Sequence, residues 1–258
     1  MIWLQQGDCL ELMKNIPDKS IDMILCDLPY GTTACKWDNV IPFEPLWELY
    51  KRIIKPNGAI CLFGSEPFST ALRASNLRMY RYDWIWAKTV ASNFVMCKKQ
   101  PLKKHEIISV FYYKQPTYNP QFEIGKPYND VRKGNYRKNI SVGDGNKLIK
   151  TPIHNSGTRY PSSVLKFSNG NNRNVHPTQK PVPLLEYLIK TYTNEGETVL
   201  DNCMGSGSTG VACVNLKRSF IGIEIKNEYF KIAEERINNA RFYKQTGGNN
   251  DSSNAERA

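Results

Sequence analysis

The chain has 258 residues and a hydrophobic content of 40%, so it is long enough to bury a full core and is ordinary in composition for a globular protein. Its 35 lysines and arginines exceed its 24 aspartates and glutamates, and the formal charge of +11 favours a polyanionic partner, nucleic acid first, over a merely solvated basic surface. The sequence has no apolar run near the roughly 20 residues that cross a membrane, and acidic side chains among its first residues exclude a secretory signal.

The seven cysteines indicate reduced thiols rather than disulfide bonds. Their number is odd, none forms a C-x-x-C pair and several lie inside apolar runs, a pattern that favours a cytoplasmic location. Only three histidines accompany them, so we expect no metal centre.

Short apolar runs alternate with helical spacings through the first part of the chain. The predicted elements are strands at 2–6, 21–26 and 59–63 and helices at 46–54 and 67–77. The first of these helices is expected to end at Pro56-Asn57-Gly58. Strand and helix in this order are typical of a mainly parallel sheet with helices on its faces.

Residues 82–88 and 106–113 are rich in β-forming side chains and predict a strand pair that flanks a basic segment. From 115 to 175 the apolar periodicity fades and basic residues alternate with aromatic ones, which suits phosphate contacts and base stacking. We interpret 115–175 as an insertion that contacts nucleic acid. A long surface insertion without a role is the alternative.

Regular spacing returns after residue 180. The predicted elements are helices at 184–192, 210–216 and 229–240 and strands at 198–200 and 219–225. The polar tail from residue 244 is predicted to be disordered.

The first candidate site is Asp27-Leu28-Pro29-Tyr30, which follows the predicted strand at 21–26. In open α/β sheets the carboxyl ends of the strands are where ligands bind. Pro29 pushes Leu28 into an extended conformation, so its carbonyl holds a fixed direction beside the Asp27 carboxylate. Two fixed acceptors and an aromatic ring suit a planar ligand with an amino group. A strand-ending turn with a capping Asp27 is the alternative.

The second candidate site begins at Asp201, where a predicted strand runs into Gly205-Ser206-Gly207 and then a helix. Glu224 ends the next strand, at a position where an acid commonly binds ribose hydroxyls. Asp201 would repel a pyrophosphate. The loop therefore favours a cationic nucleoside, such as an adenosyl group that carries an ammonium and a sulfonium.

Three motifs resemble those of S-adenosylmethionine-dependent DNA amino-methyltransferases. Asp27-Leu28-Pro29-Tyr30 resembles the catalytic motif D-P-P-Y, and residues 201–209 resemble the cofactor loop D-P-F-x-G-S-G-T-T. His176-Pro177-Thr178-Gln179-Lys180-Pro181 resembles the element H-P-T-Q-K-P, which lines the methionine side of the cofactor. The catalytic motif comes first and the cofactor loop last, which is the order of the permuted β class. The resemblance covers about residues 1–240.

This resemblance implies a Rossmann-like α/β methyltransferase fold, circularly permuted, with a seven-stranded mixed sheet. The strands at 2–6, 21–26 and 59–63 would form its catalytic half, and the strands near 198–202 and 219–225 its cofactor half. The expected domains are the catalytic half at 1–114, a target-recognition insertion at 115–175, the cofactor-binding half at 176–243 and the tail at 244–258.

The resemblance also implies roles for individual residues. Asp27, Leu28, Pro29 and Tyr30 are the expected catalytic residues. The residues expected to bind the cofactor S-adenosylmethionine are Asp8, Cys9, Asp27, Thr178, Lys180, Pro181, Asp201, Cys203, Met204, Gly205, Ser206, Gly207, Ser208, Thr209 and Glu224. A surface helix cap is the alternative for Asp8. The basic residues expected to contact DNA phosphates are Lys98, Lys99, Lys103, Lys104, Arg132, Lys133, Arg137 and Lys138.

The chain departs from the family motifs at two places. Leu28 stands for the first proline of D-P-P-Y, which is tolerable because the motif uses the carbonyl of that residue. Asn202-Cys203 stand for Pro-Phe in the cofactor loop. Cys203 removes an aromatic ring beside the cofactor, so neighbouring side chains must fill that volume.

The reaction implied is methyl transfer to the exocyclic amine of a base flipped out of duplex DNA. In this family an initial Asp is tied mainly to adenine and an initial Ser to cytosine, so Asp27 favours adenine N6 over cytosine N4. Methylation at cytosine C5 is disfavoured, because no cysteine follows a proline.

Two hypotheses belong to other classes. An enzyme that acts on RNA or on a protein glutamine has a motif that usually begins with Asn, unlike Asp27. An inactive basic DNA-binding protein is disfavoured by the presence of Asp27, Tyr30 and both loop glycines. The family is compatible with a homodimer and with a cognate restriction endonuclease, and the residues decide neither.

Overall fold

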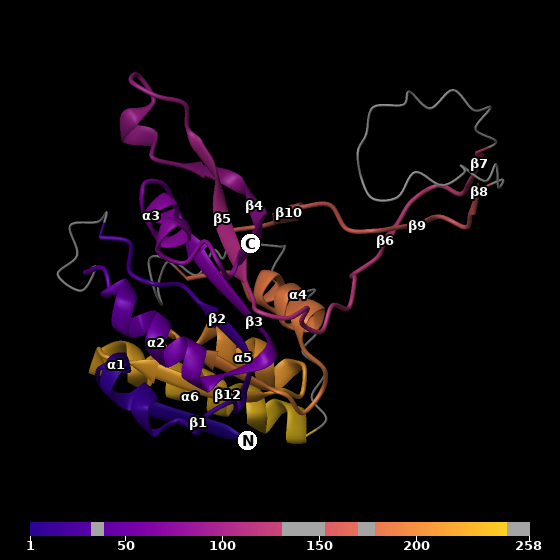
Figure 1. Ribbon diagram of the computed structural model, residues 1–258. Coiled ribbons are helices and arrows are strands. Elements are labelled where there is room, and N and C mark those ends of the chain that lie inside the picture. The colour runs from indigo at the N-terminus through magenta and orange to yellow at the C-terminus, as the bar shows by residue number, and fades with distance from the viewer. Residues whose placement is uncertain (32–38, 131–152, 170–178, 247–258) are drawn as a thin grey trace. The chain divides into compact units, whose positions relative to one another are not determined.

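The computed structural model describes residues 1–31, 39–130, 153–169 and 179–246, and it divides into two compact units (Figure 1). Unit 1 comprises Met1–Asn119 and Ser163–Ala258, and unit 2 comprises Pro120–Ser162. Within the described ranges, no helix combines the length and the apolar character needed to cross a membrane.

Unit 1 is built on an eight-stranded sheet of order β1-β12-β11-β2-β3-β5-β4-β10. The strands are β1 (Ile2–Gln6), β2 (Ile21–Cys26), β3 (Ile54–Gly64), β4 (Tyr80–Ser92), β5 (Lys103–Phe111), β10 (Val164–Phe167), β11 (Thr198–Asp201) and β12 (Ser219–Glu224). Neighbouring strands are parallel except that β5 runs antiparallel to both β3 and β4. The predicted parallel α/β architecture is therefore confirmed.

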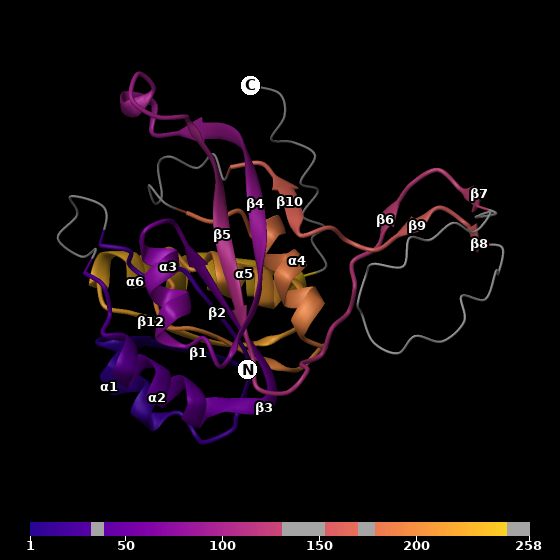
Figure 2. The ribbon, with the colours of Figure 1, turned by 45° about the horizontal axis from the view of Figure 1, so that its top comes forward.

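Helices cover both faces of this sheet (Figure 2). The helices on one face are α1 (Cys9–Leu12), the short η1 (Met13–Asn15), α2 (Phe43–Ile53) and α3 (Phe68–Ser75). Those on the other are α4 (Val182–Tyr192), α5 (Ser208–Asn215) and α6 (Asn227–Gln245). Strand β2 illustrates the division: Met23 and Leu25 pack with α4, α5 and α6, whereas Ile24 and Cys26 pack with the opposite helices. Successive strand residues point to opposite faces, so a continuous apolar run serves two cores.

Three predictions about the sheet were wrong in detail. The sheet has eight strands instead of seven, because β10, inside the range assigned to the insertion, pairs with β4. Strand β1 pairs with β12 and so lies on the side of the cofactor loop, although it was assigned to the catalytic half with β2 and β3. Helix α2 ends at Ile53 and β3 begins at Ile54, so Pro56-Asn57-Gly58 lies inside β3, where the register with β2 shifts.

Unit 2 contains two small antiparallel pairs. Strand β6 (Glu123–Ile124) pairs with β9 (Thr158–Arg159), and β7 (Tyr128–Asp130) pairs with β8 (Ile153–Asn155). The Arg159 guanidinium lies 4.7 Å from the Tyr128 ring centroid. Phe122 and Tyr160 contact each other with ring centroids 5.0 Å apart, and both side chains remain exposed. Aromatic rings in this unit are therefore presented to solvent rather than buried.

Candidate active site at the carboxyl edge of the sheet

The carboxyl ends of three neighbouring strands bring three acids to one edge. Strand β2 ends just before Asp27, β11 ends at Asp201 and β12 ends at Glu224. The antiparallel strand β5 begins at this edge, because Ile107 pairs with Gly64 at the end of β3. Glu106 therefore joins the acids of the parallel strands. This is the edge where open α/β sheets bind ligands.

Each of the two carboxylate oxygens of Asp27 accepts a hydrogen bond from a different side chain. The Tyr30 hydroxyl donates to Oδ1 at 2.5 Å, and the Lys180 ammonium donates to Oδ2 at 2.5 Å. The Asp27 side chain is 27% exposed, which leaves it reachable from solvent. Burial raises the pKa of Asp27, and the neighbouring Lys180 opposes that rise. The structure thus brings Asp27, Tyr30 and Lys180 together.

Lys180 also connects Asp27 to a second acid. Its ammonium lies 3.3 Å from Glu106 Oε2, and Lys88 donates to Glu106 Oε1. We call Asp27, Lys180, Glu106 and Lys88 the charged row. Burial would raise the pKa of Glu106, but the two ammonium groups outweigh it and hold that pKa below its usual range. Burial alone would lower the pKa of Lys180. The negative charges of Asp27 and Glu106 outweigh that effect, so the pKa of Lys180 is raised.

Glu106 and Lys88 were missed by the sequence analysis. They lie on the antiparallel strands β5 and β4, where Glu106 pairs with Trp86. Both side chains are largely buried. The only available signal was an acid inside a run of β-forming residues, and a solvent-facing position would have produced the same pattern.

Tyr30 and Leu28 occupy distinct environments. The Tyr30 ring stacks on Phe68, with centroids 5.0 Å apart and an interplanar angle of 28°. Burial raises the pKa of Tyr30, so its hydroxyl stays protonated as a donor. Leu28 is buried in the apolar cluster with α2 and α3. A larger apolar side chain in place of proline is thus accommodated by the core rather than by the site.

The second candidate site is organised around Asp201. Its Oδ1 accepts the Cys203 backbone N–H at 3.1 Å, and its Oδ2 accepts the Thr209 hydroxyl at 2.6 Å. Burial raises the pKa of Asp201 to about 6. Gly205 and Gly207 have φ of 51° and 79°, a left-handed conformation that favours glycine. The loop therefore folds back over the carboxylate that begins it.

Glu224 and Arg236 fix the same loop from the outside. Glu224 Oε2 accepts the Gly205 backbone N–H at 2.9 Å, and Oε1 accepts the Lys226 backbone N–H at 2.8 Å. Burial raises the pKa of Glu224. Arg236, on α6, donates to the Ser206 carbonyl at 2.5 Å and to its hydroxyl at 2.9 Å. Arg236 was not predicted, because an arginine on a helix usually faces solvent.

Thiols fill the space around Cys203. Cys203 interacts with both Cys9 and Cys26, each of which is buried. Burial raises the pKa of Cys26 to about 12, and contact with Cys203 raises that of Cys9 further, so these thiols stay protonated. Asp8 caps α1, since its carboxylate accepts the backbone N–H groups of Leu10 and Glu11. This geometry corresponds to the alternative role considered for Asp8, a cap at the surface.

The remaining predicted residues divide by location. Met204 is buried and Pro181 precedes α4, and Ser208 begins α5. Lys98 and Lys99 lie between β4 and β5, and Lys103 and Lys104 lie at the start of β5. Lys103 is half-buried and the other three are exposed. The predicted residues that lie outside the described ranges are Arg132, Lys133, Arg137, Lys138 and Thr178.

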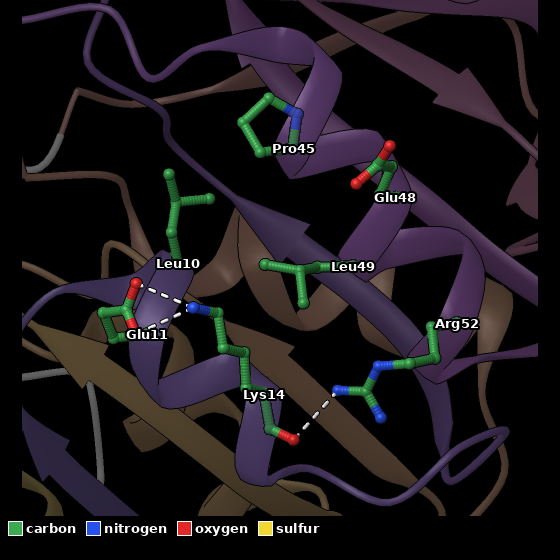
Figure 3. Close-up of a pocket in the computed structure, with 7 residues that line it drawn as sticks. All are labelled: Leu10, Glu11, Lys14, Pro45, Glu48, Leu49 and Arg52. Carbon is green, nitrogen blue, oxygen red and sulfur yellow. Dashed lines mark hydrogen bonds and ion pairs between the residues drawn. The ribbon is translucent and has the colours of Figure 1, made fainter.

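A shallow pocket of about 340 Å³ lies between α1 and α2 (Figure 3). The Lys14 ammonium pairs with the Glu11 carboxylate at 2.8 Å. The backbone carbonyl of Lys14 accepts a hydrogen bond from the Arg52 guanidinium at 3.3 Å. The pocket is lined by Leu10, Glu11, Lys14, Pro45, Glu48, Leu49 and Arg52. None of these residues belongs to the charged row or to the Asp201 loop.

Residues 21–235 match a protein family described as DNA methylase, of the N6/N4 type. Among curated relatives, the type II methyltransferase M.HpaI of Haemophilus parainfluenzae is 31% identical over 90% of this chain and 72% of its own length. The type II methyltransferase M2.LlaDCHI of Lactococcus lactis subsp. cremoris is 28% identical over 93% of this chain and 90% of its own length.

Solved structures resemble the chain over most of its length. The crystal structure of an M1.HpyAVI–SAM complex has a TM-score of 0.61 and 26% identity, and the match covers 92% of this chain and all of that one. The cytosine-N4-specific PvuII DNA methyltransferase has a TM-score of 0.63 at 17% identity, over 95% of this chain and 93% of that one. The second likeness concerns the fold alone.

Proposed function

Because the chain belongs to the N6/N4 DNA methylase family, we propose that it transfers a methyl group from S-adenosylmethionine to the exocyclic N6 amine of an adenine in duplex DNA. The family makes the chain a DNA amino-methyltransferase. We further propose that the target is adenine, that the base is flipped out of the duplex and that the residues have the roles given below. The observation that carries them is the setting of Asp27, a reachable carboxylate held by Tyr30 and Lys180 beside the Asp201 loop.

The residues of the carboxyl edge fit S-adenosylmethionine as the methyl donor. Asp201 and Glu224 place two buried carboxylates beside a loop that turns at Gly205 and Gly207, and this negative edge suits a ligand with a sulfonium and an ammonium. The Glu224 carboxylate accepts the backbone N–H groups of Gly205 and Lys226 and keeps lone-pair capacity for a ribose hydroxyl. When bound, the donor supplies a methyl group made electrophilic by its positively charged sulfur.

The target amine needs activation, because its lone pair is delocalised into the base. We assign this task to the Asp27 carboxylate and the Leu28 carbonyl, which accept the two amine hydrogens and draw the nitrogen towards a pyramidal form. Each Asp27 oxygen already accepts one hydrogen bond and retains capacity for another. Fixed acceptors of this kind need no reorganisation during the reaction, which is where their catalytic benefit arises.

The methylated nitrogen must then lose a proton, and Asp27 is the base that contacts it. A carboxylate whose pKa is raised by burial accepts a proton more readily than an exposed one. Lys180 keeps the carboxylate ionised before the reaction, because its positive charge favours the negative form. The protonated Tyr30 hydroxyl holds the carboxylate in one orientation.

Adenine is favoured over cytosine by the identity of residue 27. The family resemblance links an initial Asp to adenine and an initial Ser to cytosine. Cytosine N4 is the competing candidate. Both amines would use the same pair of acceptors, so the acceptor geometry is compatible with either base.

The test is methyl transfer by the purified protein. Tritium from S-adenosylmethionine labelled in its methyl group is expected to enter unmethylated plasmid DNA. After digestion of that DNA to nucleosides, the label is expected in N6-methyl-2′-deoxyadenosine. Label in N4-methylcytosine would support the competing candidate. Absence of label in DNA would contradict the proposed reaction.

Asp27→Ala is expected to lower transfer by at least 1,000-fold, because it removes the acceptor and the base at once. Its affinity for DNA in a gel-shift assay is expected to stay within about threefold, since phosphate contacts dominate that affinity. Glu11→Gln, at an exposed ion pair on α1, is the matched control and is expected to leave transfer unchanged. Transfer by Asp27→Ala at the rate of the unmodified protein would refute the mechanism.

Four further features of the function are proposals. The relatives named type II methyltransferases support a partnership with a cognate restriction endonuclease. Residues 115–175 are proposed as the target-recognition insertion. The reduced thiols and the DNA substrate favour a cytoplasmic location, and a homodimer is compatible with the family.

A further inference from the structure

Strands β4 and β5 continue past the edge that carries the candidate active site. The hairpin residues 89–102 follow the last regular cross-strand pairs and project beyond the rest of the sheet, as the two views of unit 1 agree (Figures 1 and 2). We call residues 89–102 the hairpin arm. The arm includes a short turn, η2 (Phe94–Met96).

The tip of the hairpin arm presents apolar side chains to solvent. Phe94 is 74% exposed and Val95 is 95% exposed. The turn that carries them has its own backbone hydrogen bonds, from Met96 N–H to the Asn93 carbonyl and from Gln100 N–H to the Met96 carbonyl, both at 3.0 Å. The apolar groups are thus displayed by a structured turn. Neighbouring apolar side chains that an ordered turn presents to solvent are suited to contact a partner.

The charge of the arm identifies the class of that partner. The arm carries Lys98 and Lys99, and Lys103 and Lys104 follow it at the start of β5, with no aspartate or glutamate from residue 89 to residue 105. A surface whose charges are all positive suits a phosphate backbone. The arm therefore combines phosphate-binding cations with an apolar tip.

The arm is also anchored to the active site. Lys88 and Glu106, at its base, belong to the charged row that reaches Asp27 through Lys180. At about 3.3 Å per residue, the stretch from Lys88 to Phe94 spans at most roughly 20 Å. Asn169, which follows β10, donates to the Val90 carbonyl at 3.1 Å and so fixes the end of the arm that joins the sheet.

We propose that the hairpin arm inserts Phe94 and Val95 into the base stack of duplex DNA beside the target nucleotide. This proposal rests on the proposed function and adds the element that holds the flipped state open. Extrusion of a base costs a few kcal/mol and leaves a gap in the stack. Apolar side chains that enter between base steps are a known way to occupy such a gap. The lysines of the arm would hold the adjacent phosphates.

The test compares two duplexes that share one target site, once that site has been located by sequencing methylated plasmid DNA. In the first duplex the target base has its normal partner. In the second it lies opposite an abasic site, which lowers the cost of extrusion. Single-turnover methylation is measured for the unmodified protein, for the double variant Phe94→Ala/Val95→Ala and for Phe242→Ala. Phe242 is an exposed phenylalanine on α6 and serves as the matched control.

The double variant is expected to methylate the paired duplex at least 10-fold more slowly and the abasic duplex within about threefold of the unmodified protein. Phe242→Ala is expected to match the unmodified protein on both. An unchanged rate on the paired duplex, or an equal loss on both duplexes, would overturn the proposal. A change of oligomeric state in sedimentation would also overturn it, because the tip would then contact a second copy of the chain. Failure of the unmodified protein to methylate either duplex would instead refute the proposed function.

A second measurement separates the lysines from the apolar tip. Lys98→Gln/Lys99→Gln is expected to weaken DNA binding and to reduce the slope of log K against log salt by up to about 2, since each phosphate contact contributes about 0.9. Phe94→Ala/Val95→Ala is expected to leave that slope unchanged. A reduced slope in the apolar variant would contradict the division of roles.

Discussion

At the scale of single residues, the ionisation of Asp27 is balanced between burial and its neighbours in the charged row. Burial raises its pKa most, Lys180 lowers it and Glu106 raises it. A carboxylate that accepts hydrogens from the target amine must be ionised. Methylation is therefore expected to increase with pH as Asp27 loses its proton, at a pH above that of an ordinary aspartate.

Two variants of the charged row are expected to shift the pH dependence of methylation in opposite directions. The part of the profile concerned is its acid limb, where the rate rises as Asp27 loses its proton. Glu106→Gln removes a negative neighbour, lowers the pKa of Asp27 and moves the limb to lower pH. Lys180→Gln removes the positive neighbour and moves it to higher pH. The measurement is the single-turnover rate against pH, with saturating S-adenosylmethionine and DNA.

Glu11→Gln is the control for this pair, because Glu11 contacts Lys14 and no member of the charged row. Its profile is expected to overlay that of the unmodified protein. Shifts of Glu106→Gln and Lys180→Gln in the same direction would show that the charge of the row does not set the ionisation of Asp27.

At the scale of elements, the Asp201 loop is shaped by its contact with α6. Gly207 has a φ of 79°, and a Cβ placed there would lie 2.8 Å from Ala233 Cβ. Arg236, one turn further along α6, bonds the Ser206 carbonyl and hydroxyl. The helix thereby fixes the loop both by steric contact and by hydrogen bonds.

Gly207→Ala and Gly196→Ala form a matched pair that tests this contact. Both glycines have a left-handed φ, 79° and 84°, but a Cβ at Gly196 would meet nothing within 4 Å. Gly196→Ala is expected to cost about 1 kcal/mol of unfolding free energy from backbone strain. Gly207→Ala is expected to cost about 1–3 kcal/mol more, because it overpacks the junction with α6.

Urea unfolding followed by circular dichroism measures both costs, and calorimetric titration measures the binding of S-adenosylmethionine. Only Gly207→Ala is expected to weaken that binding. Equal losses of stability in the two variants would indicate that steric contact with α6 adds nothing to the strain.

Some elements were readable from the sequence and others were not, for identifiable reasons. Strands β2 and β11 were predicted because both of their faces are buried, so their residues form unbroken apolar runs. Strand β10 was missed, because Val164 and Lys166 face solvent and only Leu165 is fully buried. A four-residue edge strand with one buried side chain has too little periodicity to distinguish it from a loop.

The same limit applies to the candidate site. Asp27, Tyr30, Asp201 and Glu224 follow strands or turns whose positions the sequence reveals. Glu106 becomes part of the site only through the pairing of β5 with β3, which no local pattern encodes. Long-range strand order was therefore the missing information for the charged row as well as for the place of β1.

At the scale of the whole molecule, the charged row and the Asp201 loop both lie within unit 1. Unit 2 interrupts unit 1 between Asn119 and Ser163, and none of the strands described in unit 2 belongs to the main sheet. Binding of the methyl donor and recognition of the DNA target are thus expected to be separable.

Replacement of Pro120–Ser162 by a flexible Gly/Ser linker of about 12 residues is expected to separate them. The shortened protein is expected to bind S-adenosylmethionine within about threefold of the full chain by calorimetric titration. Its transfer of labelled methyl to plasmid DNA is expected to fall at least 100-fold. Loss of donor binding would contradict the independence of unit 1, and undiminished transfer would contradict the proposed role of the insertion.

The strand order also governs when the enzyme can first act during its synthesis. Asp27 directly follows β2, near the start of the chain, and the neighbouring strand β11 carries Asp201 from near the end. At about 5–20 residues per second, the ribosome needs on the order of 10–30 s to pass from one to the other. For that interval the nascent chain holds the proposed acceptor of the target amine without the loop proposed to bind the methyl donor. Methylation is therefore expected to begin only after nearly all of unit 1 has left the ribosome.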